Sequence, residues 1–395
     1  MENKFDIKYE RKSLSPKILL YGLSLLALGV LLFLLAYATD ARRASFNMNI
    51  VYMYILSLGL GSLFFVALEY LANADWSVPF RRIAEILGAL LFVAPLLAIP
   101  LAFDMHGLFH WTHEEALAVD RALATKAPYL NVGFFLIRSA IAFVLAGTFY
   151  FLIARRSFKQ DASPRGDFRR KATRWSAIFM PIFAIATSIF AIDWMMSLEP
   201  HWYSTIFAVY YFSGTFLAAL ALLTIFVVPL SEKGYLGGLI NKDHYYNFGA
   251  MMFAFVNFWA YIAFSQYMLM WYANLPEETF WFLNRWNGSW SAISLGLIFI
   301  HFIVPYSVLL SQPSKSAPGT LKFMAAWILV AHYYDLYWII MPTYSPKGAA
   351  LSWMEFIGPV LIAGIVLTTF ALVARRRNLL PVGDEKLPRG LNFHL

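Results

Sequence analysis

Long apolar runs alternate with short polar connections along almost the whole chain. Ten such runs, each about 20 residues or more in length, lie near residues 17–37, 47–72, 82–103, 130–154, 175–197, 204–230, 245–272, 290–311, 320–341 and 353–374. A helix needs about 20 apolar residues to cross the hydrocarbon core of a bilayer. The pattern therefore predicts an all-α integral membrane protein with about ten transmembrane helices.

Two aspartates suggest an internal repeat. The fifth and ninth runs each carry one aspartate in their last two turns, Asp193 and Asp335. If the second to fifth and the sixth to ninth runs are parallel four-helix repeats, the two aspartates are equivalent.

The first run has no small-residue cleavage site, so we expect a retained span there rather than a removable signal peptide.

Basic residues gather at the ends of the apolar runs. The chain has a net charge of +8, and its densest basic segments are the connection 155–174 and the run 375–377. Positive residues favour the cytoplasmic side, and ten spans place both segments on the same side. We therefore expect both termini in the cytoplasm and no nucleic-acid partner.

The chain contains no cysteine. Its absence excludes disulfides, thiolate-ligated iron–sulfur clusters and covalent c-type haem from this chain. Any redox centre must therefore be non-covalent or belong to a partner subunit.

Two carboxylates lie near the inner ends of the second and third runs, Glu69 and Glu85. An ionised group in the bilayer centre costs about 3 kcal/mol on insertion scales, so such groups usually face the bundle interior and have partners. Arg81 and Arg82 precede Glu85 at helical spacing, which allows an ion pair. Glu69 lacks such a neighbour, which favours a carboxylate that is buried or reached by water.

Near the outer side, Arg138 in the fourth run and Asp193 in the fifth lie at comparable depths. One interpretation is a buried ion pair that joins two helices. The other is that Asp193 exchanges protons near the outer surface. We expect Pro200 to end the fifth helix and to leave Glu199 and His201 in a turn at the outer interface.

Two histidines occur inside apolar runs, His301 in the eighth and His332 in the ninth, and their depths allow them to meet near the midplane. Asp335 follows His332 by three residues and shares its helix face. An Asp–His contact would suit proton relay. Two hydrogen-bonded core histidines, or two axial ligands of one b-type haem, remain alternatives.

Two stretches resemble a known family: "DWMMSLEPHWYSTIF" at 193–207 and "FSQYMLMWYANLPEETFWFLNRW" at 264–286. Together with the ten runs, they resemble the NrfD-like integral membrane subunits of bacterial alternative complex III, a quinol:cytochrome c oxidoreductase. The resemblance implies two four-helix bundles plus two peripheral helices. The parts expected on this basis are a cytoplasmic N-terminus with the first helix (1–46), two bundles (47–200 and 201–345), and the tenth helix with a cytoplasmic tail (346–395).

The resemblance also implies a setting. It places the chain in the bacterial inner membrane, with a sister NrfD-like subunit, an iron–sulfur subunit, c-type cytochromes and membrane lipids as partners. Haem and iron–sulfur clusters would lie in those partner subunits. We expect no cofactor bound by this chain itself, although a quinone is possible.

Three functions are compatible with these residues. The first is a non-redox subunit that conducts protons and supports assembly, with Glu69, Glu85, Arg138, Asp193, His301, His332 and Asp335 as proton-transfer candidates. The second is direct quinol binding, with His332 and Asp335 as proton acceptors beside an aromatic pocket. The third is a purely structural membrane anchor. Outside respiration, an internal repeat also suits a secondary transporter.

Overall fold

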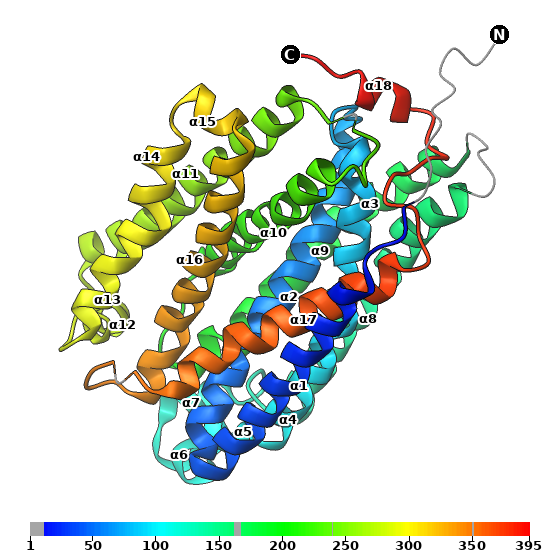
Figure 1. Ribbon diagram of the computed structural model, residues 1–395. Helices are drawn as coiled ribbons and strands as arrows, with labels where there is room; N and C mark the ends of the chain where they lie inside the picture. Colours follow the sequence, from blue (N-terminus) through cyan, green and yellow to red (C-terminus); the bar gives the residue numbers. More distant parts are fainter. Residues whose placement is uncertain (1–11, 162–166, 239, 350) are drawn as a thin grey trace.

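The computed structural model describes residues 12–161, 167–238, 240–349 and 351–395. Within these ranges, ten helical segments are long and apolar enough to cross a membrane, and no β-strand occurs (Figure 1). The predicted all-α membrane class is therefore confirmed.

The ten segments follow the predicted runs closely. Six of them, each a single helix, are α1 (Pro16–Thr39), α2 (Ala41–Ala72), α8 (Val132–Gln160), α9 (Asp167–Trp194), α10 (Phe207–Glu232) and α11 (Lys242–Ala273). Towards the C-terminus lie α16 (Pro318–Tyr344) and α17 (Ile357–Ala374), the latter preceded by a 3-10 turn, η5 (Trp353–Phe356). The helices α8 and α9 extend further into the basic connection than their apolar runs do.

Two spans are interrupted. The third consists of α3 (Val78–Leu87), a 3-10 segment η1 (Gly88–Phe92) and α4 (Ala94–Phe103). The eighth consists of α13 (Trp290–Leu297), a π-helical segment η4 (Ile298–Ile303) and α14 (Val304–Leu309). Because π-helical turns are frequent at functional sites, the second interruption draws attention to His301, which lies within it.

Shorter helices form the connections. At one end of the molecule lie α5 (Met105–Leu108), η2 (His110–Thr112), α6 (Glu114–Val119), α7 (Arg121–Lys126), η3 (Met196–Leu198) and α12 (Pro276–Asn284). At the opposite end lie α15 (Gln312–Ser316) and α18 (Leu387–Leu391).

The helices α2 and α10 form the centre of the molecule. Within their most apolar segments, 94% and 83% of the residues are buried. Helix α2 packs against α9, α10 and α16, so the first half of the chain contacts the second along its length. The division into bundles at 47–200 and 201–345 stays a prediction.

A peripheral pair, α1 and α17, covers one side of this centre, with the two helices side by side (Figure 1). Small residues allow the close approach: a Cβ added to Gly364 would lie only 2.3 Å from the backbone nitrogen of Leu26. Such small-residue contacts are typical of helix pairs in membranes.

Candidate functional site

All seven proton-transfer candidates are buried, but they lie in three separate groups. The carboxylates Glu69 and Glu85 belong to an ion network of α2, α3 and the tail, Arg138 and Asp193 form a pair between α8 and α9, and the two histidines meet Asp335 in the interior. Each group has a different charge balance, and that difference decides what chemistry it supports.

Arg81 is the centre of the ion network that contains Glu69 and Glu85. Its guanidinium contacts Glu69 Oε1 at 2.8 Å and Glu85 Oε1 at 3.2 Å. Arg82 contacts Glu85 Oε2 at 3.2 Å, so the ion pair expected for Glu85 is present. Glu69 also has a basic partner, which helical spacing missed because Arg81 lies across the turn between α2 and α3. The sequence signal for this pair was that Glu69 and Arg81 lie close to each other along the chain, on either side of one short turn.

The tail after α17 completes the network. Asp384 accepts a hydrogen bond from Arg81 Nη2 at 2.7 Å and lies 3.4 Å from Arg169 Nη1, and its side chain is fully buried. Burial alone would raise the pKa of Asp384, but Arg81, the backbone N–H of Lys386 and Arg169 outweigh it and hold the pKa below its ordinary value. No pattern in the sequence placed Asp384 here.

At the opposite end of the molecule, Arg138 and Asp193 form the predicted pair. Arg138 Nε donates to Asp193 Oδ2 at 2.9 Å and Nη2 donates to Oδ1 at 3.1 Å. Tyr129 also donates to Oδ1, at 3.1 Å. Burial and the nearby Asp193 carboxylate raise the pKa of Tyr129, so its hydroxyl stays a donor. The geometry matches the interpretation of a buried ion pair that joins α8 and α9.

The polar turn after α9 forms ion pairs with two other connections between helices. Helix α9 ends at Trp194, before Pro200, so the proline lies in the turn rather than ending the helix. Glu199 contacts Arg285 Nη2 at 3.1 Å, and His201 contacts Asp120 at 2.5 Å. Burial lowers the pKa of Arg285 to about 10, which keeps it charged at neutral pH. Glu199 therefore neutralises a buried cation.

The third group is central, and no arginine or lysine pairs with it among the described residues. One ligand atom each from His301, His332 and Asp335 lies within 4.8 Å of the others, so the two histidines do meet as predicted. In the part of the chain that the structure describes, no ion pair reaches Asp335. This carboxylate is 2% exposed.

Asp335 is oriented by two hydrogen-bond donors. The Tyr210 hydroxyl donates to Oδ1, and Trp259 Nε1 donates to Oδ2 at 3.1 Å. Asp335 and His332 lie close together, as considered from the sequence, but the ring pairs through Nε2 with Ser57 Oγ at 2.9 Å. The tyrosine and tryptophan were missed because they lie on α10 and α11, far from Asp335 in sequence.

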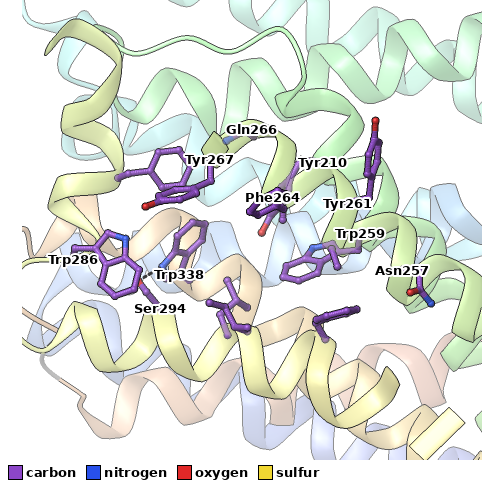
Figure 2. Close-up of a pocket in the computed structure, with 16 residues that line it drawn as sticks. Tyr210, Asn257, Trp259, Tyr261, Phe264, Gln266, Tyr267, Trp286, Ser294 and Trp338 are labelled. Carbon is purple, nitrogen blue, oxygen red and sulfur yellow. Dashed lines mark hydrogen bonds between the residues drawn. The ribbon is translucent and has the colours of Figure 1, made fainter. Parts of the chain in front are cut away.

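An aromatic pocket adjoins this cluster. Its volume is about 620 Å³, and its walls come mainly from α11, α12, α13 and α16 (Figure 2). Both Tyr210 and Trp259 line it while they hold Asp335. The pocket also contains Gln266, which is 3% exposed and whose Oε1 has no hydrogen-bond partner among the described residues. The pocket thus offers aromatic surface, the side-chain amides of Asn257 and Gln266, and a nearby carboxylate.

Two comparisons with known proteins found no match for this chain. No protein-family model matches the chain, and no curated protein matches it. The described residues establish an all-α fold with ten helices fit to span a membrane and a buried His–His–Asp cluster beside an aromatic pocket.

Proposed function

We propose that this chain is a membrane subunit of a respiratory quinol:cytochrome c oxidoreductase and that its own part is to transfer protons and support assembly. Two points support the assignment to such a complex: the resemblance of 193–207 and 264–286 to NrfD-like subunits, and the ten apolar helices. The inner-membrane location, cytoplasmic termini and partner subunits are part of the same proposal.

One observation carries the proton role: Asp335, His301 and His332 are buried together without a neutralising arginine or lysine among the described residues. Such groups inside a membrane protein commonly form proton relays. By contrast, Glu69, Glu85 and Asp193 each have an arginine partner. Their proton roles stay predictions, and we place the main transfer step at the central cluster.

Tyr210 connects Asp335 to the pocket side of the cluster. Tyr210 is one of the pocket-lining residues, and its hydroxyl donates to Asp335 Oδ1. A proton that arrives at the phenol oxygen can be matched by transfer of the phenol proton to Asp335, which leaves Tyr210 neutral. The arrangement therefore permits proton exchange between the pocket and the buried carboxylate.

The test uses the reconstituted complex with quinol and cytochrome c, and it measures protons released per electron. We expect Asp335→Asn and His332→Gln to lower this ratio. Glu355→Gln is the matched control because Glu355 is also a buried carboxylate but pairs with Arg43 at 2.8 Å, away from the cluster. Full turnover with an unchanged ratio in both cluster variants would remove the proposal.

The pocket favours a second candidate, direct quinol binding. A hydroquinone ring would pack between the aromatic walls, and a quinol hydroxyl would donate to the unpartnered Gln266 Oε1 (Figure 2). Its electrons would leave to a partner's redox centre. Here Gln266→Leu should weaken photolabelling of this chain by an azidoquinone, whereas Gln312→Leu, at an exposed position, should not. Labelling confined to another subunit would contradict it.

A further inference from the structure

The central cluster contains buried histidine nitrogen atoms that are bare, that is, without a hydrogen-bond partner among the described residues. Both ring nitrogens of His301 and Nδ1 of His332 lack a hydrogen-bond partner among the described residues, and each histidine is 1% exposed. Leaving a buried polar atom unsatisfied costs about 1–3 kcal/mol. Three such atoms beside one carboxylate indicate that a ligand completes the site.

The hydrogen bonds of Ser57 fix which nitrogen of His332 is bare. The Ser57 hydroxyl donates its one hydrogen to the backbone oxygen of Tyr54 at 2.7 Å. It must therefore accept from His332 Nε2–H, 2.9 Å away. Nδ1 then carries a free lone pair, as a metal ligand requires. A histidine whose second nitrogen donates to a neighbour is the usual arrangement in metal sites.

His301 is held by packing and not by hydrogen bonds among the described residues. Its ring stacks on Trp259 with centroids 3.8 Å apart, but no hydrogen bond restrains either nitrogen in the described structure. It also lies in the π-helical segment η4, where the extra residue per turn shifts the side chain relative to an α-helix. The third ligand, Asp335, is already oriented by Trp259 and Tyr210.

A glycine on α10 leaves room beside these atoms. A Cβ added to Gly214 would lie 3.1 Å from His332 Nδ1 and 3.8 Å from Asp335 Oδ2. Alanine would therefore place a methyl group next to both ligand atoms. The lack of a side chain at this position keeps that space open.

We propose that His301, His332 and Asp335 form a binding site for one divalent ion of the zinc class. Two imidazoles and one carboxylate are a common set for such ions, with a fourth position left for water. A tetrahedral zinc holds its ligand atoms about 3.3 Å apart. The present separations, all within 4.8 Å, would close to that value by small side-chain movements of these three residues.

A small ion fits this site better than a haem. A porphyrin between the two imidazoles would have to displace Asp335 and the adjacent backbone of Gly214, both of which lie beside His332 Nδ1. The proposed zinc binding depends only on the geometry of the three ligands and not on the proposed proton role. If the proposed proton role holds, zinc would occupy the same acceptor atoms as the proton, and it would inhibit turnover.

The experiment uses the full chain in lipid nanodiscs, without a histidine tag. His106, His110 and His113 are replaced by glutamine in every sample, because His106 and His113 stack at 3.7 Å in the outer connection and His110 lies beside them. Zinc is counted after dialysis, and cobalt serves as a spectroscopic probe whose visible bands are intense when it is four-coordinate.

We expect one zinc per chain and intense cobalt bands in the parent protein. His301→Phe and Gly214→Ala should each abolish both signals, and Ser57→Ala should weaken binding by about 10–100-fold. Gly214→Ala is the sharper variant, since it keeps all three ligands. Zinc content equal in the parent and both variants would overturn the inference, as would no binding in a folded parent. Either result leaves the proton ratio of Asp335→Asn as a separate test of function.

Discussion

The tail residue Asp384 gives the most direct prediction about stability. In Asp384→Ala, Arg81 and Arg169 lose a carboxylate that is fully buried between them. Removing one partner of a buried ion pair costs about 3–5 kcal/mol. Arg81 keeps Glu69 and Glu85, so we expect a smaller loss, about 2–3 kcal/mol in the free energy of unfolding.

The pH dependence of the same variant has a definite sign. The folded protein holds the pKa of Asp384 below its ordinary value, so the unfolded chain binds the proton more readily. The stability that Asp384 contributes is present above its ordinary pKa of 3.8, and it is lost as pH falls through the lowered value. The gap in the free energy of unfolding between wild type and Asp384→Ala should therefore shrink in that acidic range.

Denaturant unfolding in detergent measures this loss, and limited proteolysis reports whether the tail leaves the helix ends. Glu385→Ala is the matched control because Glu385 is the exposed neighbour in the same segment. Equal unfolding free energies for Asp384→Ala and Glu385→Ala would refute the reasoning, since they would show that the buried contacts of Asp384 contribute nothing.

Three further predictions concern other contacts. Arg138→Leu leaves Asp193 buried without its cation and should lower the unfolding free energy by about 3–5 kcal/mol, whereas Arg138→Lys should lose less, as measured by denaturant titration. Glu199→Gln should lower thermal stability, because the buried Arg285 loses its counter-charge. Gly364→Val should separate α1 from α17, and a disulfide between cysteines placed on their facing sides should then form more slowly; unchanged cross-linking would contradict the packing.

Much of the fold could be predicted from the sequence because bilayer thickness fixes how long each apolar run must be. The ten runs and ten helical segments agree, with boundaries that differ by a few residues at most ends. The larger differences, at the start of α2, the end of α8 and the start of α9, arise because each helix continues past the apolar region into a basic segment.

The site could be predicted only in part. Helical spacing found the Arg81–Glu85 pair, and equal depth found the Arg138–Asp193 pair and the meeting of His301 with His332. Such arguments work for residues on one helix or at one membrane depth.

The remaining partners could not be predicted because they come from distant parts of the chain. Tyr210 and Trp259 hold Asp335 from α10 and α11, Ser57 fixes the tautomer of His332 from α2, and Asp384 enters from the tail. Which face of each helix points inward depends on packing among all the helices, and the apolar stripes do not reveal it because lipid-facing and core-facing sides are both apolar.

The proton-to-electron ratio of the reconstituted complex tests the central claim most directly. With Asp335→Asn, quinol oxidation should release fewer protons per electron than the wild type, while Glu355→Gln should keep the wild-type ratio. A ratio that stays at the wild-type value in Asp335→Asn, with turnover intact, would contradict the assignment of proton transfer to the central cluster.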